Sequence, residues 1–355
     1  MASFNTPLTR LLRIRTPVVL APMGGASGGL LASQVSLAGG FGFFSPDYTS
    51  LSSLSSQFDI ARKALDVPTG PLPIGVGFLG WRLDRGPRDP KEPHHAQFDL
   101  ALSQQVRAIW LSFGNDLLKW VDRIRSHDAA QSPPRKTIIF VQVGSVSEAI
   151  RAANEWKVDV IVAQGNESGG HGSSTAPPLL TLLPSIIRAF PSGHAPPILA
   201  AGGLTNPEHV ATLLTLGASG TVHGTLFLPA PASLYTSTQK KAILAADDAS
   251  TIRSYAFDLL RGTTGWPTAV DGRGLAVSSV VELEGMKQDV VPEGVDLEEA
   301  RKQMNKRGEE VVWAGTGVGT LNGIREAADI VRELHDGALE ALRAASGLVS
   351  GSDQT

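Results

Sequence analysis

The chain has 355 residues, of which 42% are hydrophobic and 18% charged, and its formal net charge is −3. This balance is typical of a globular protein and gives no electrostatic case for binding nucleic acid or an anionic membrane surface. The chain has no cysteine, which excludes disulfides, thiolate nucleophiles and cysteine metal sites.

No apolar run approaches the roughly 20 residues that a membrane-spanning helix needs. The first 17 residues carry Arg10, Arg13 and Arg15 and no acidic residue, which leaves open a weak mitochondrial presequence. We favour a short helix over residues 9–13 that leads into the first strand. We therefore expect a cytoplasmic protein, a monomer or homodimer that contacts neither nucleic acid nor membrane.

Eight short apolar runs alternate with amphipathic helical patterns, of which the clearest lie at 117–125, 146–155, 179–189 and 207–216. Such alternation over about 210 residues predicts an α/β fold, specifically a (β/α)8 TIM barrel. The predicted strands are residues 18–23, 40–45, 73–79, 108–113, 137–143, 158–163, 197–203 and 220–227. The polar residues 80–98 are expected to form a surface loop.

After residue 230 the alternation of strands and helices gives way to helices separated by loops. The sequence therefore predicts three parts in the chain. Residues 1–230 would form the barrel, and residues 231–320 a mainly helical and loop region that covers the active site, with helical patterns at 239–246 and 297–308. Residues 321–355 would form a terminal helix, centred on 329–345, that packs on the barrel, followed by a frayed tail.

The stretch from Gln164 to Gly172 follows the sixth predicted strand and contains four glycines and one imidazole, His171. In barrels of this kind the catalytic residues lie at the carboxyl ends of the strands. Glycines let a backbone approach a flat or anionic ligand, and a histidine beside them can move a proton near neutral pH. The stretch therefore predicts a cofactor platform with a base beside it, although a plain connecting turn would look similar.

Other strand ends carry glycine and amide groups. Gly202 and Gly203 follow the seventh strand, and Gly224 and Thr225 the eighth, which is the usual phosphate position in such barrels. Gln142 and Gln164 end neighbouring strands and can hydrogen-bond the edge of a heterocycle. No lysine ends a strand, which argues against a Schiff-base aldolase, and the acidic residues are too few for a magnesium site, so no metal is expected.

At this point the sequence resembles the nitronate monooxygenase family, formerly called 2-nitropropane dioxygenases. The resemblance rests on residues 21–24 (Ala-Pro-Met-Gly), 164–171, 200–203 (Ala-Ala-Gly-Gly) and 220–227, with a looser match at 313–317. It covers roughly residues 6–230. It implies a barrel that contains FMN and oxidises alkyl nitronates, and possibly nitroalkanes, with O₂ to a carbonyl compound and nitrite.

The resemblance also implies roles for individual residues. His171 matches the family histidine that acts as base or substrate-binding group. The FMN-binding residues that the resemblance implies are Met23, Gly24, Gly169, Gly170, Gly202, Gly203, Gly224 and Thr225. To these we add Pro22, Gln142 and Gln164 from their places at strand ends. The sequence departs from the family at Gly77, where many members have Asn, at Gly172, where Arg is common, and at His223, where an apolar residue is usual.

We expect a largely apolar substrate pocket above the cofactor, with Glu167 orienting the ring of His171. The residues expected to form the pocket are Phe78, Phe113, His223, Trp266 and Trp313. Two alternatives stay open. One is another FMN-dependent oxidoreductase of this barrel family, such as an NAD(P)H-dependent enoyl reductase or a secondary-metabolism oxidase. The other is a non-catalytic flavin- or phosphate-binding protein, for which a histidine at this place would serve no purpose.

Overall fold

Eight parallel strands close into a barrel, as the sequence predicts. The computed structural model describes residues 3–46, 49–85, 93–114, 116–190, 195–285 and 295–348. The last strand of the barrel pairs with the first, so the sheet has no free edge. The strands, in barrel order, are β1 (Val18–Leu20), β2 (Phe41–Phe44), β3 (Leu72–Leu79), β4 (Val106–Ser112), β5 (Ile138–Val143), β6 (Val160–Gln164), β8 (Ile198–Ala201) and β9 (Gly220–His223).

Helices surround the barrel, and several begin with a capping side chain. Ser145 and Asn206 accept hydrogen bonds from backbone amides in the first turns of α7 (Val146–Asn154) and α9 (Pro207–Thr215). These bonds satisfy donors that the helix itself cannot pair. The helices of the barrel part are α1 (Pro7–Leu12), α2 (Gly29–Leu37), α3 (Leu51–Leu65), α4 (Gly80–Asp84), α5 (His94–Ser103), α6 (Leu118–Ala129), α7 (Val146–Asn154), α8 (Leu179–Arg188) and α9 (Pro207–Thr215).

The expectation of a surface loop over residues 80–98 was wrong at both ends of that segment. Residues 80–84 form α4 and residues 94–98 belong to α5, while residues 86–92 lie outside the described part. Phe98 is fully buried against the ring of Phe78, with ring centroids 5.1 Å apart. Burial of that apolar face stabilises a helix that the polar composition alone does not predict.

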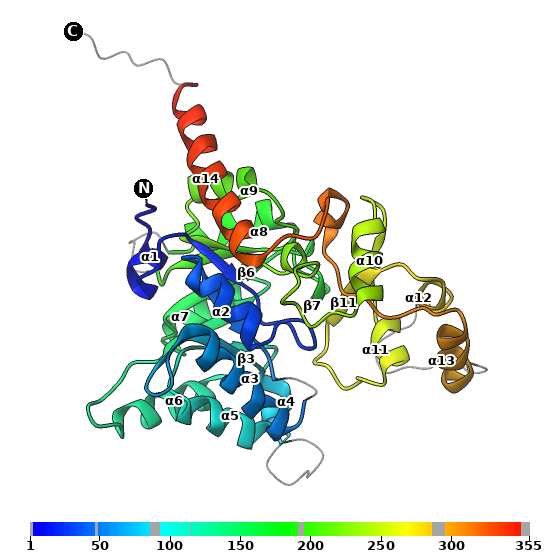
Figure 1. Ribbon diagram of the computed structural model, residues 1–355, viewed down its shortest axis with the longest axis horizontal. Helices are drawn as coiled ribbons and strands as arrows, with labels where there is room; N and C mark the ends of the chain where they lie inside the picture. Colours follow the sequence, from blue (N-terminus) through cyan, green and yellow to red (C-terminus); the bar gives the residue numbers. More distant parts are fainter. Residues whose placement is uncertain are drawn as a thin grey trace.

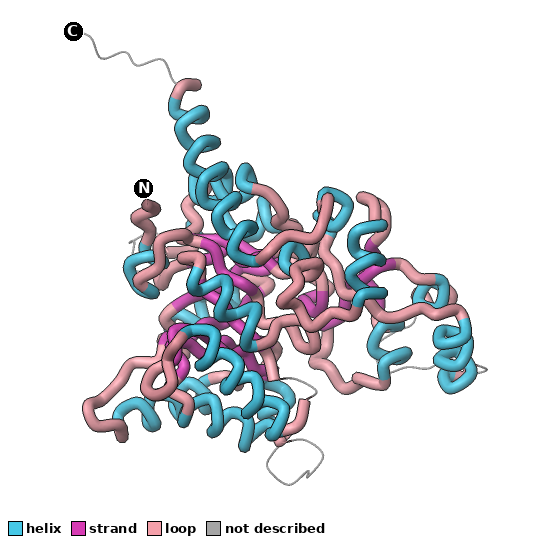
Figure 2. Tube along the Cα trace, viewed as in Figure 1, coloured by secondary structure: helices cyan, strands magenta, loops and turns pink. Residues whose placement is uncertain are grey.

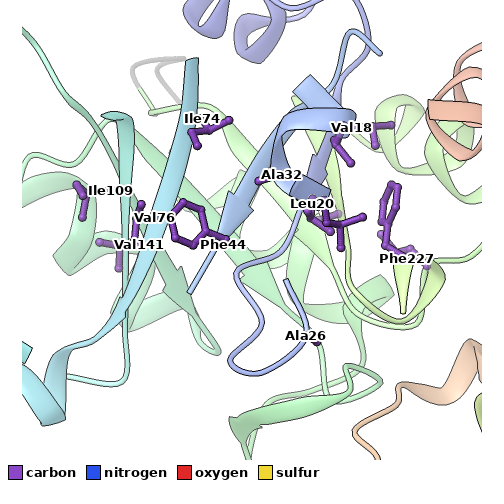
Figure 3. Close-up of a cluster of buried hydrophobic side chains, with 14 of the residues drawn as sticks. Val18, Leu20, Ala26, Ala32, Phe44, Ile74, Val76, Ile109, Val141 and Phe227 are labelled. Carbon is purple, nitrogen blue, oxygen red and sulfur yellow. The ribbon is translucent and has the colours of Figure 1, made fainter. Parts of the chain in front are cut away.

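Side chains alternate between the inside and the outside of the barrel wall, as a strand geometry requires. Val19, Phe43 and Trp110 belong to the buried cluster inside the barrel, which Leu8 and Leu12 of α1 extend. The neighbouring residues pack outward against the helices, and Figure 3 shows part of this second cluster, including Val18, Leu20, Phe44 and Val76. The barrel is thus filled with side chains except at the mouth.

Most of the chain after β9 forms a lobe at one side of the barrel, labelled α10 to α13 in Figure 1. Its helices are α10 (Ser237–Ala245), α11 (Ala256–Arg261), α12 (Ser278–Val281) and α13 (Leu297–Lys306), with short 3₁₀ turns at η1 (Thr225–Phe227) and η2 (Thr316–Thr320). The mainly helical extension is as expected, but it also contains a small antiparallel sheet. That sheet consists of β10 (Thr251–Ser254), β11 (Val270–Leu275) and β7 (Gly170–Ser173).

The tube in Figure 2 shows the last helix, α14 (Ala327–Ser346), beside the barrel, where it contacts α9 and α2. Gly337 permits this contact, because an added Cβ would lie 2.6 Å from Pro207. The frayed tail was predicted from Ser346, which instead ends α14, and residues 349–355 lie outside the described residues. The three-part division of the chain stays a prediction. Among the helices that the structure describes, none is both long enough and apolar enough to cross a bilayer.

His223, expected in the substrate pocket, is instead a core residue at the end of β9. Its side chain is fully buried, with Nε2 2.9 Å from Thr221 Oγ1 and Nδ1 3.2 Å from the carbonyl oxygen of Leu204. Burial, as the main cause, lowers the pKa of His223 to about 4. The imidazole is therefore neutral at pH 7 and has a structural role.

We predict that His223 makes the folded state sensitive to acid. Its pKa is about 4 in the folded chain and about 6.5 in the unfolded chain, so the unfolded state binds the proton more readily. Stability is therefore lost as the pH falls from about 7 to about 4.5, by up to about 3 kcal/mol over the whole shift. In urea unfolding between these pH values, His223→Gln should lose less stability than wild type. An equal loss in both proteins would contradict this assignment.

Candidate active site

A cavity of about 180 Å³ lies where the carboxyl ends of the strands meet the C-terminal lobe. His171 and all the residues predicted to bind the cofactor line it. These are Pro22, Met23, Gly24, Gln142, Gln164, Gly169, Gly170, Gly202, Gly203, Gly224 and Thr225. The structure thus brings together residues from Pro22 to Thr225 of the sequence.

His171 is held by a carboxylate that the sequence analysis missed. Its Nε2 lies 2.8 Å from Oδ2 of Asp258, a buried residue of α11. Asp258 Oδ1 also accepts hydrogen bonds from the hydroxyl of Thr263 at 2.7 Å and from the indole N–H of Trp266 at 3.1 Å. Because a carboxylate only accepts, Nε2 of a neutral His171 carries the hydrogen, and Nδ1 is left as the basic nitrogen.

Two indole rings fix the plane of this imidazole. Trp266 stacks on His171 with ring centroids 3.5 Å apart and an interplanar angle of 10°. Trp313 lies at 4.8 Å with a tilt of 56°, and Phe113 in turn contacts the edge of Trp266 at 5.5 Å. Both tryptophans and Phe113 line the cavity. Its upper wall is therefore aromatic, with the imidazole as a polar group within it.

Glu167 was expected to orient His171, and this expectation was wrong. Both oxygens of its carboxylate accept from the backbone N–H of Leu179, at 2.9 and 3.0 Å, at the start of α8. There a negative charge is favourable, because the N-terminus of a helix carries partial positive charge. Asp258 takes the place that Glu167 was expected to occupy.

The two glutamines form a chain that ends at the histidine segment. Gln142 Nε2 donates to Gln164 Oε1 at 2.8 Å, and Gln164 Nε2 donates to the carbonyl oxygen of His171 at 3.2 Å. The pair thus holds β7 in place while it lines the cavity. The amides therefore serve a structural purpose as well as offering polar groups to a ligand.

Glycines form the floor of the cavity, and three of them have positive φ angles, Gly170 with φ of +70° among them. Gly202 has φ of +124° and Gly203 of +69°, conformations that favour glycine. Gly169 has a packing role, because an added Cβ would lie 2.4 Å from the backbone of Ala314. Thr225 Oγ1 accepts from the amide of Gly315 at 2.9 Å, so its hydroxyl hydrogen stays available to a ligand.

Two buried polar atoms in the cavity lining have no hydrogen-bond partner among the described residues. They are the indole Nε1 of Trp110 on β4 and the hydroxyl of Ser168 in the loop after β6. Buried polar groups are normally paired, so unpaired ones at a cavity point to a ligand. A flat heterocycle rich in hydrogen-bond acceptors, such as a flavin, suits both atoms and the glycine floor.

Phe78 was expected in the pocket, but it does not belong to the cavity lining. The neighbouring residue Leu79 lines the cavity, whereas Phe78 packs outward on Phe98 of α5. The same alternation separates Val222, which lines the cavity, from the buried His223. In both places the expected side chain lies one residue from the position that faces inward.

Comparisons with known proteins identify the family of this chain. A model of the nitronate monooxygenase family matches residues 5–337. A nitronate monooxygenase of Neurospora crassa is 32% identical, over 93% of this chain and 91% of the relative. A nitronate monooxygenase of Metarhizium robertsii is 34% identical, over 91% of each chain.

Solved structures show the same architecture. Nitroalkane oxidase from Streptomyces ansochromogenes is similar with a TM-score of 0.73 and 26% identity, over 96% of this chain and all of that one. FabK from Thermotoga maritima shares the fold, with a TM-score of 0.75 and 21% identity over 98% of this chain and 100% of FabK. From the family match and the two fungal relatives, the chain belongs to the nitronate monooxygenase family and is an enzyme, a flavin oxidoreductase.

Proposed function

We propose that this enzyme uses FMN to oxidise alkyl nitronates, and neutral nitroalkanes, with O₂ to a carbonyl compound and nitrite. The observation that carries the proposal is that His171, which lines a cavity with a glycine floor, is bonded at 2.8 Å to the buried Asp258 behind it. A binding protein would have no use for an oriented base there. The similarity to a nitroalkane oxidase and to nitronate monooxygenases supports the choice of substrate class.

FMN fits the residues that line the cavity. Gly202, Gly203, Gly224 and Thr225 offer backbone N–H groups and one hydroxyl where such barrels hold phosphate. Met23 and Gly24 offer a surface to the flavin ring, and the unpaired indole N–H of Trp110 offers it a hydrogen bond. When bound, FMN supplies the site's capacity to take up a pair of electrons and pass them to O₂.

His171 would remove the proton that makes a nitroalkane oxidisable. A neutral nitroalkane must lose its α-proton, and Nδ1 of His171 is the nitrogen free to take it. Asp258 stabilises the resulting imidazolium through the hydrogen bond at Nε2. The aromatic wall of Trp266, Trp313 and Phe113 excludes water from this step and surrounds the alkyl part of the substrate.

An enoyl reductase that takes electrons from NAD(P)H stays the alternative, since FabK shares the fold. Oxygen uptake distinguishes the two activities. With a preformed nitronate and no nicotinamide, the proposed enzyme consumes O₂ and releases nitrite. Consumption of NADH with an enoyl substrate, without turnover of nitronates, would replace the proposal by the alternative.

The placement of the cofactor can be tested at Gly224, where a side chain fits the protein. An added Cβ would lie 3.3 Å from Met23 Sδ, the end of a flexible side chain that can shift slightly, and 3.9 Å from Ala21. The residue has φ of −113°, outside the left-handed region that favours glycine. Gly203, with φ of +69°, would be a less clear test. We predict that Gly224→Val folds but is purified with little flavin, measured by its visible spectrum. A matched Gly347→Ala at the end of α14 should keep full flavin content, and equal content in both variants would refute the placement.

The role of His171 can be tested with two forms of one substrate. A base within reach typically contributes about 10²–10⁴-fold to a proton transfer. We predict that His171→Asn lowers kcat/KM for a neutral nitroalkane by at least about 100-fold, and for the preformed nitronate far less. Asp258→Asn should also lower kcat/KM for the nitroalkane more than for the nitronate, but by a smaller factor.

The measurement is nitrite release from the nitroalkane and from the nitronate, in variants with matched flavin content. It gives the ratio of the two kcat/KM values for each variant. Equal losses on the nitroalkane and the nitronate would show that His171 positions the substrate or supplies charge. No loss on either would show that it is structural.

A further inference from the structure

Three charged side chains gather on the small sheet of the C-terminal lobe. Arg253 of β10 and Arg273 of β11 pair directly opposite each other, and Asp271 precedes Arg273 by two residues. Because side chains alternate along a strand, these three share one face of the sheet, whereas His171, opposite Gly272, lies on the other face. The cluster therefore lies behind the histidine, and none of its members lines the cavity.

Arg253 spreads its guanidinium over the loop that carries the histidine. Its Nε and Nη2 both donate to Oδ1 of Asp271, Nε at 2.9 Å, and only 13% and 11% of the two side chains are exposed. Nη2 also donates to the carbonyl oxygen of Gly172 at 3.0 Å, and Nη1 donates to that of Asn166 at 3.3 Å. One side chain thus joins the two ends of the loop, and Gly172 is the residue that follows His171.

Glycine at position 172 leaves room for this contact. An added Cβ would lie 2.8 Å from Oε1 of Gln164 and 3.5 Å from Nη2 of Arg253. Gln164 in turn donates to the carbonyl oxygen of His171 at 3.2 Å. Two successive carbonyl oxygens of β7 are therefore held by side chains from two different strands. Position 172 is also one of the places where the sequence departs from the family.

Arg273 holds one end of the same loop. Its Nε donates to the carbonyl oxygen of Asn166 at 3.2 Å, so that oxygen accepts from both arginines. Burial, as the main cause, and then the neighbouring Arg253 lower the pKa of Arg273. Asp271 offsets one of the two positive charges, and the charge-assisted hydrogen bonds to carbonyl oxygens offset part of the other. The loop is therefore held by charge, and Arg253 is the arginine that joins both of its ends.

We propose that Arg253 is a positioning residue of the active site, which sets the place of His171 by holding the carbonyl oxygens of Asn166 and Gly172. The proposal rests on the proposed function, since it concerns the histidine that takes the α-proton. Asp258 fixes the imidazole from α11, and Arg253 fixes the backbone that carries it. A displacement of about 1 Å costs up to about 100-fold in a reaction that depends on alignment.

The kinetic test compares a neutral nitroalkane with its preformed nitronate, of which only the first needs the base. In variants with matched flavin content, Arg253→Gln should lower kcat/KM for the nitroalkane about tenfold more than for the nitronate, mainly through kcat. Arg253→Lys should give an intermediate ratio, because it keeps the charge beside Asp271 and loses the planar fork of donors. The double variant Arg253→Gln, Asp271→Asn repeats the test without leaving a buried carboxylate unpaired.

Arg273→Gln is the matched control, because it removes the same charge from the neighbouring strand. Within the described part of the chain, Arg273 makes no hydrogen bond to Gly172. The control should keep the wild-type ratio of the two kcat/KM values, since Arg253 still holds both carbonyl oxygens. An equal fall of the ratio in Arg273→Gln would overturn the proposal. So would a wild-type ratio in Arg253→Gln or in the double variant.

A measurement without turnover separates this proposal from the proposed function. The ring of His171 lies over the indole of Trp266, so the ring current of that indole shifts the proton NMR signals of the imidazole. These signals, identified by their loss in His171→Asn, should move toward the values of an exposed histidine in Arg253→Gln and stay in place in Arg273→Gln. If wild type oxidised neither substrate, the proposed function would fail while these signals still decided the role of Arg253. Unchanged signals in Arg253→Gln would overturn that role.

Discussion

The hydrogen bond between His171 and Asp258 is the contact on which the rest of the site depends. It joins β7, which follows the sixth barrel strand, to α11, which lies almost 90 residues later in the chain. β7 alone would not fix the position of His171, because this strand is short and rich in glycine. The same carboxylate also accepts from Trp266, so one buried acid fixes both the imidazole and the indole stacked on it.

The small sheet brings these groups into register. His171 of β7 pairs opposite Gly272 of β11, where an added Cβ would lie 2.3 Å from the ring of Trp313. Only glycine therefore allows Trp313 to approach the imidazole. Arg253 of β10 pairs with Asp271 and donates to the carbonyl oxygens of Gly172 and Asn166. This partly buried pair holds both ends of the histidine loop and limits its alternative conformations.

The sequence allowed the barrel and the cofactor face to be predicted, for a physical reason. Short apolar runs separated by amphipathic helices have few ways to bury their surface, and parallel strands bring all their carboxyl ends to one face. Every glycine and amide predicted for the cofactor therefore lines one cavity. Phe78 and His223 were misplaced because a shift of one residue moves a strand side chain from the interior to the helix side.

Asp258 and β7 could not be predicted in this way. β7 reads Gly-His-Gly-Ser, without the β-branched or aromatic residues that indicate a strand, and it forms only because β11 lies beside it. Asp258 lies in a six-residue helix of otherwise apolar character except for its last residue. A lone acid in such a helix is a weak signal of a buried partner. Its partner is identified only when the tertiary structure places His171 beside it.

In the proposed mechanism His171, held by Asp258, removes the α-proton of a neutral substrate. The most direct measurement is the deuterium isotope effect on nitrite release from nitroethane labelled at the α-carbon, compared with release from its preformed nitronate. We expect a severalfold slower reaction of the labelled nitroalkane in wild type. No such difference is expected with the nitronate, whose proton has already been lost. An isotope effect near one with the neutral nitroalkane, together with undiminished turnover in His171→Asn, would contradict it.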